Sequence, residues 1–99
     1  MAENPMDVIK KLDERLLGII NENRTFSFED GALLKKTKYL IALALDASHG
    51  ATDGVKALAL EATKNGAAKD EIMETLRVAN FISGVGCIYT ASRALKDIL

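Results

Sequence analysis

The chain has 99 residues, which is a typical length for one domain. Thirteen basic and fourteen acidic residues give a net charge of −1, so the clustered basic surface that nucleic acids require is not expected. Hydrophobic residues make up 48% of the chain but aromatic residues only 5%, which favours close packing of helices rich in small aliphatic side chains. One small core cannot bury all of these side chains, so we expect a homo-oligomer.

The N-terminal region predicts a helix over residues 5–22. Asn4 can cap its first free amides, Pro5 suits its first turn, and Asp7 places a negative charge where the helix dipole favours it. Apolar residues then recur at three- and four-residue steps and form one stripe, namely Ile9, Leu12, Leu16, Ile19 and Ile20.

A connector is expected over residues 21–31, with a short helical turn near residues 29–33. It carries Phe26 and Phe28, whose rings we expect to pack against the body of the chain or against a partner subunit. The next helix is predicted over residues 35–48. Its middle is apolar on nearly all sides, which is typical of a buried helix, so we place it at the centre of the assembly.

The C-terminal half predicts three more helices. The first follows His49-Gly50, is capped by Thr52 or Asp53, and ends at Asn65-Gly66. The second begins near Lys69 without a capping side chain, and the last spans residues 85–98. Their expected buried faces consist of Val55, Leu58, Ala59 and Ala62, then Ile72, Leu76, Ala79 and Ile82, then Ile88, Ala91, Ala94, Leu95 and Ile98. No strand-like alternation is found, so the predicted fold class is all-α.

Other features bear on the compartment. Cys87 is the single cysteine, which excludes an intrachain disulfide and fits a reducing compartment. The N-terminal sequence MAENPMDVIKK does not resemble a signal peptide, and the longest apolar run, residues 39–45, is far shorter than the ~20 residues that span a bilayer. We therefore expect a cytoplasmic protein that does not enter the membrane.

Three motifs carry a family resemblance. They are K-x-K-x-L-I-A-L-A at residues 36–44, A-x-x-x-G-A-x-x-x-E-I-x-E-x-L at residues 62–76, and a glycine-containing turn at residues 84–86 followed by A-x-x-A-L. In order and spacing they resemble the carboxymuconolactone decarboxylase and alkylhydroperoxidase D-like family. The resemblance covers residues 33–96 of a single domain, 1–99, whose residues 1–30 form the N-terminal helix and connector. It implies a compact subunit of five to six helices, assembled as a trimer or hexamer, with active sites near the subunit interfaces.

The resemblance implies one of two activities. The peroxidase branch uses two thiols, assisted by a histidine and a glutamate, and the matching positions here hold Ala51, Gly54, Leu58 and Tyr39. The histidine of the lactone decarboxylase branch also matches Leu58. We therefore expect a peroxidase- or decarboxylase-like activity on a small organic substrate that does not use a dithiol pair. The alternative is a catalytically inactive helical oligomer that binds a small molecule or serves as a scaffold.

Three residues are candidates for catalysis. His49 can act as a general acid or base oriented by Asp46, or it can simply cap the last carbonyls of its helix. Cys87 can be activated in the first turn of the last helix, or it can be an inert buried side chain. One histidine and one cysteine cannot form a thiolate or imidazole metal site in a single chain, so neither a metal nor a cofactor is predicted.

Overall fold

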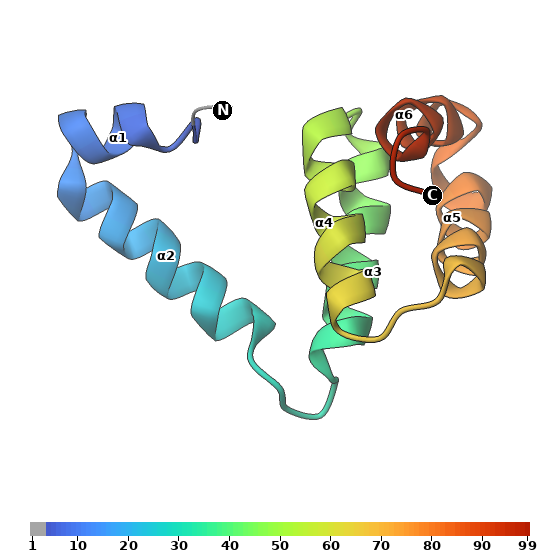
Figure 1. The fold of residues 1–99 in the computed structure, drawn as a ribbon, viewed down its shortest axis with the longest axis horizontal. Helices are drawn as coiled ribbons and strands as arrows, with labels where there is room; N and C mark the ends of the chain where they lie inside the picture. Colours follow the sequence, from blue (N-terminus) through green and yellow to red (C-terminus); the bar gives the residue numbers. More distant parts are fainter. Residues whose placement is uncertain (1–3) are drawn as a thin grey trace.

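The structure, a computed structural model, describes residues 4–99 and is all-α over that range, as expected. Its helices are α1 (Asp7–Leu12), α2 (Glu14–Phe28), α3 (Lys35–Ser48), α4 (Thr52–Lys64), α5 (Lys69–Ser83) and α6 (Gly86–Leu95). Helices α3 to α6 form a compact core, while α1 and α2 form an N-terminal arm that extends away from it (Figure 1). The arm and the core are joined by residues 29–34.

The prediction of a single helix over residues 5–22 is wrong, because the arm consists of two helices, α1 and α2. Asp13 interrupts the helix with φ −156° and ψ 83°, and its carboxylate accepts a hydrogen bond of 3.0 Å from the backbone N–H of Leu16. Aspartate is a preferred N-cap because its side chain satisfies an amide that a helix start leaves unpaired. The N-cap preference of this residue therefore prevails over the continuous apolar stripe.

The second correction concerns the expected connector. α2 continues to Phe28, so most of the segment predicted as a connector is helical, and the helical turn predicted near residues 29–33 is absent. The connector in the structure, residues 29–34, is tied to the start of α3 by two hydrogen bonds. The backbone N–H of Lys35 donates to the Asp30 carboxylate at 2.7 Å, and the Lys38 ammonium donates to the Glu29 carbonyl at 2.7 Å.

The core is built around α3, whose bounds agree with the predicted helix over residues 35–48. α3 packs most extensively against α4, and α6 and α5 complete the core. Leu43, Val55 and Ile72 are its largest fully buried side chains. The other buried members of this cluster are Ala47, Ala59, Leu76, Ala79, Cys87, Ala91, Ala94 and Leu95.

The helix ends agree only partly with the sequence. Gly50 has φ +76°, the left-handed conformation expected where α3 ends. α4 begins after Ala51 without a side-chain cap, so the predicted cap by Thr52 or Asp53 is wrong. At the start of α5 the Glu71 carboxylate accepts the Ala68 backbone N–H at 2.9 Å, and it also forms an ion pair of 3.0 Å with Lys36 of α3. Glu71 thus compensates for the missing N-cap side chain and links two helices.

Several apolar faces stay uncovered in the single chain. α1 and α2 have no buried residue, and Ile82, which was predicted to be buried, is 76% exposed. In α3 only Leu43 and Ala47 are buried, whereas Leu45 is 56% exposed, so this helix is not buried all round. α6 ends at Leu95 instead of residue 98. Across residues 4–99, no helix has the length and apolar character needed to cross a membrane.

Candidate functional site

A cleft of about 420 Å³ lies where α2, α3 and α4 meet. α3 contributes Tyr39, Ala42 and Asp46, which recur at three- and four-residue steps and so share one face of that helix. The other lining residues are Arg24 and Phe28 of α2, and Gly54, Ala57 and Leu58 of α4. The cleft therefore has one wall from the arm and two walls from the core.

The Asp46 carboxylate lies directly against Gly54 in the cleft. A side-chain Cβ placed on Gly54 would lie 2.9 Å from Asp46 Cγ and closer still to Asp46 Oδ2. The carboxylate thus fills the space that any larger residue at position 54 would need. It also lies against the first turn of α4, where the helix dipole favours a negative charge.

The arm reaches the cleft through an aromatic stack. The rings of Phe28 and Tyr39 are nearly parallel, with an interplanar angle of 15° and centroids 4.6 Å apart. Phe28 is half-buried by this contact, whereas Phe26 is 73% exposed. Phe28 therefore packs against the body of the chain, which is one of the two positions expected for these rings. For Phe26 the other position, against a partner subunit, stays a prediction.

The cleft holds one cation and one anion. The two salt bridges found between described residues join Lys36 to Glu71 and Lys64 to Glu61, so neither Arg24 nor Asp46 has an ion-pair partner in residues 4–99. A guanidinium can bind a carboxylate through two parallel hydrogen bonds, and an aspartate can take up or release a proton. The cleft therefore offers a site for an anionic group beside a proton-transfer group and apolar walls.

The three predicted catalytic residues lie in different environments. Asp46 is half-buried and lines the cleft. His49 is exposed at the C-cap of α3, and its backbone N–H donates to the Leu45 and Asp46 carbonyls at 3.1 and 3.2 Å. Cys87 is only 3% exposed and belongs to the apolar core cluster. Of the three, only Asp46 is among the residues that line the cleft.

Arg24 and Phe28 are among the lining residues that were not identified as candidates from the sequence. They lay in the stretch taken for a connector, so their four-residue spacing on one helix face was not recognised. Within the described part of the chain, no three His, Cys, Asp or Glu side chains are grouped so that they could hold a metal ion.

Comparison with known proteins identifies the family. The model of the carboxymuconolactone decarboxylase family matches residues 15–97, which is most of the chain. The chain belongs to this family. It is also similar to the crystal structure of apo-lpg0406, a carboxymuconolactone decarboxylase family protein from Legionella pneumophila, with a TM-score of 0.85 and 28% sequence identity. That match covers 92% of this chain and 81% of the Legionella chain. No curated protein matches the chain.

The cleft can be compared with the catalytic positions that the family resemblance implies. Four positions were matched, by resemblance, to the cysteines, the histidine and the glutamate of the family's peroxidase branch. Three of them, Tyr39, Gly54 and Leu58, line the cleft, and the fourth, Ala51, directly precedes α4. The cleft therefore occurs where the resemblance places family chemistry, but it is lined by different side chains.

Proposed function

We propose that the cleft binds a small carboxylated organic compound and that Asp46 transfers a proton during a decarboxylase-like reaction. The observation that carries this proposal is the placement of the Asp46 carboxylate against Gly54, on the same cleft as Arg24. The guanidinium would hold a substrate carboxylate, and the apolar walls formed by Phe28 and Leu58 would surround the organic part of the compound.

The reaction needs few groups. Loss of CO₂ breaks one carbon–carbon bond and leaves its electron pair on the substrate carbon, which then takes up a proton. Asp46 would deliver that proton and recover one from water, so the sum is one proton consumed for each CO₂ released. No thiol, metal or oxidant enters this balance.

The peroxidase-like alternative has less support. Reduction of a hydroperoxide by the family mechanism requires two thiols, whereas this chain has only Cys87, which is buried in the core. A thiol so shielded from solvent offers a peroxide little access.

A non-catalytic binding module is the second candidate. It is favoured by the residues that replace the family's catalytic groups, because Gly54 and Leu58 have no functional group. The ligand class is the same for both candidates, since Arg24 would bind the carboxylate in either case. Turnover is therefore what separates them.

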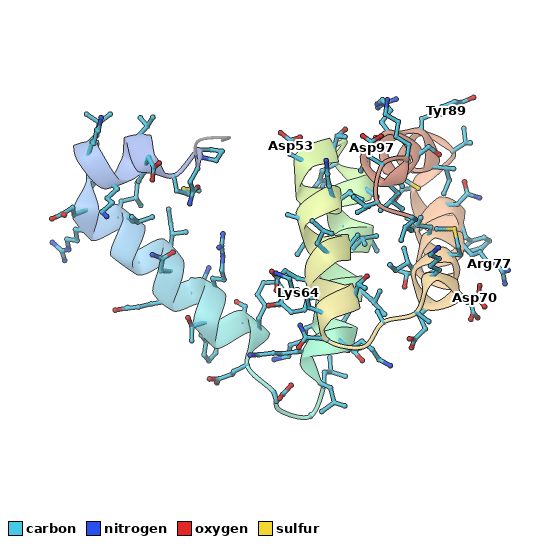
Figure 2. The ribbon with its side chains drawn as sticks, viewed as in Figure 1. Asp53, Lys64, Asp70, Arg77, Tyr89 and Asp97 are labelled. Carbon is cyan, nitrogen blue, oxygen red and sulfur yellow. The ribbon has the colours of Figure 1, made fainter. Side chains whose placement is uncertain are left out.

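We also propose that the chain works as a homo-oligomer, for which the resemblance implies a trimer or hexamer. The exposed apolar side chains support this, because the junction of α5 and α6 alone exposes Val78, Phe81, Ile82, Val85 and Tyr89 by 61% or more. Figure 2 shows the Tyr89 side chain projecting outward from α6. The radius of gyration of 14.3 Å also exceeds the roughly 13 Å of a compact chain of this length.

The test combines binding with product detection. Benzoate and a set of unsaturated acids of four to six carbons would be titrated by calorimetry, and CO₂ release from each would be followed. Arg24→Gln should weaken binding by about tenfold or more, while Asp46→Asn should abolish CO₂ release with binding retained. Arg93→Gln and Asp97→Asn are the matched controls on exposed sites.

Each result decides between the candidates. Binding that depends on Arg24, accompanied by CO₂ release that depends on Asp46, supports the enzyme. Binding that depends on Arg24 without release of CO₂ from any acid supports the binding module. Equal affinities for the wild type and Arg24→Gln, or no binding of any acid, would overturn the assigned ligand class.

A further inference from the structure

A groove separate from the cleft lies between α5 and α6, where α6 lies across the C-terminal end of α5 (Figure 1). Its volume is about 750 Å³, within the roughly 300–1,000 Å³ of sites that take small molecules. Each helix lines it with a row of residues three, four and seven apart, so each turns one face toward it. The row on α5 runs from Met73 to Asn80, and the row on α6 runs from Ile88 to Leu95.

The groove combines an apolar base with positive charge. Leu76, Ala91 and Leu95 are buried along it, whereas Arg77 and Lys96 are exposed. Figure 2 shows the Arg77 side chain extending outward from α5. No aspartate or glutamate is among the lining residues, and neither cation takes part in the two salt bridges found in residues 4–99. An anionic group bound here would therefore meet two cations that have no ion-pair partner among the described residues.

The row on α5 sets the length of a ligand that fits the groove. The seven steps from Met73 to Asn80 span about 10 Å at 1.5 Å per residue. An extended chain advances about 1.2 Å per bond, so about eight bonds cover this length. A linear aliphatic tail can thus lie along the apolar base, and a carboxylate at its end complements the unpaired cations.

We propose that the groove between α5 and α6 binds a free aliphatic carboxylate of about eight to ten carbons. Its tail lies over Leu76 and Leu95, and its carboxylate lies beside Arg77 and Lys96. This inference does not rest on the proposed function, because the groove shares no lining residue with the cleft between α2, α3 and α4.

The first test measures the contributions of the tail and of the charge. Calorimetry would compare hexanoate, octanoate and decanoate, each below its micelle-forming concentration. Affinity should rise about two- to fourfold for each added CH₂ and level off beyond decanoate, where the tail outgrows the groove. Octan-1-ol, which has no charge, should bind more weakly than octanoate. Equal affinities for hexanoate and decanoate, or for the alcohol and the acid, would contradict the proposal.

Variants in the groove give the specific comparison. Arg77→Gln and Lys96→Gln should each weaken decanoate binding about two- to fivefold, whereas Arg93→Gln, on exposed α6 surface outside the groove, should leave it unchanged. Met73→Glu places a charge in the apolar wall and should lower the affinity about tenfold or more. Met73→Leu keeps that wall apolar at a similar volume and should retain binding.

The methionine methyl groups locate the ligand without substitution. Met73 lines the groove, whereas Met6 lies outside it, beyond the start of α1. In protein labelled with ¹³C at the methionine methyls, decanoate should shift the Met73 signal, which is identified by its loss in Met73→Leu. The Met6 signal should not move. A Met73 signal that stays unchanged at saturating decanoate would overturn the assigned site.

The remaining outcomes separate this site from other occupants and from the cleft. Decanoate binding that depends on Arg24 and not on Arg77 would place the acid in the cleft and overturn the proposal. Binding to phosphatidylglycerol vesicles without binding of monomeric decanoate would overturn it in favour of a membrane surface. Dispersal of a self-associated chain by Met73→Glu in sedimentation velocity, with no decanoate bound by the wild type, would overturn it in favour of a second copy. If no acid binds in the cleft while decanoate binds as described, the proposed function fails and the groove site stands.

Discussion

The contact between Asp46 and Gly54 makes a prediction that can be tested without knowing the substrate. In Gly54→Ala the new Cβ would lie 2.9 Å from Asp46 Cγ, too close for an ordinary contact, so the carboxylate must rotate away. Leaving its preferred rotamer costs about 0.5–1.5 kcal/mol. Alanine in place of glycine in α4 returns roughly 0.5–1 kcal/mol. We expect a net change in stability close to zero.

Asp46→Ala removes the atoms that would clash. In that background Gly54→Ala should therefore stabilise the protein by about 0.5–1 kcal/mol, the full helix-propensity gain. The double-mutant cycle should give a coupling free energy of about 0.5–1.5 kcal/mol between the two sites. The cycle also cancels the effect of replacing Asp46 on the propensity of α3.

Urea unfolding of the four proteins measures this cycle. All four must be compared at one chain concentration, because association shifts apparent stability, and equal m-values are needed for the comparison to hold. Equal effects of Gly54→Ala in the two backgrounds would refute the assigned contact. In the wild-type background the same substitution should also reduce CO₂ release, because it moves the carboxylate out of its place in the cleft.

Three further predictions concern stability. Gly18 has open space where a Cβ would lie, so Gly18→Ala should stabilise α2 by about 0.5–1 kcal/mol. Helix content and the urea midpoint measure this gain, and an unchanged midpoint would contradict it. Asp13→Ala removes the N-cap of α2 and should lower the free energy of unfolding by about 1 kcal/mol. Asp13→Asn should lower it much less, because asparagine is also a good N-cap, and equal losses in the two variants would argue against capping. The Ala68 backbone N–H and the Lys36 ammonium hold the pKa of Glu71 below its ordinary value of 4.5. Its contribution is therefore fully present above pH 4.5 and is lost as the pH falls through the folded-state pKa, so Glu71→Gln should flatten the fall in stability in acid. A fall of the same steepness in both proteins would rule out this role.

The comparison of sequence and structure is most informative in the arm. The apolar period continues through Asp13, so periodicity alone indicated one helix, whereas the capping preference of aspartate divides it. Beyond residue 22 the period weakens, and the helix nevertheless continues to Phe28, whose ring stacks on Tyr39. That contact between two helices joins residues that no local pattern connects.

The residues of the candidate site were likewise predictable only where they lie on a helix whose bounds the sequence predicts. Asp46 was a candidate because it lies three residues before His49 and could orient its imidazole, and it does line the cleft. Arg24 was not, because its place in the cleft depends on how the C-terminal end of α2 lies against α3 and α4. His49 shares α3 with Asp46, but one turn carries it to the exposed C-cap.

The sequence by itself determined the all-α class, the bounds of α3 and the family, because periodicity, glycine turns and ordered motifs are local properties of the chain. Only the tertiary structure decided that α2 and α3 share a stacked aromatic pair, that Asp46 fills the space above Gly54, and that Cys87 is buried away from the cleft. The physical reason is that each of these features depends on how separate helices pack against one another. That packing is decided by the volumes of side chains from different helices together, and not by any local pattern.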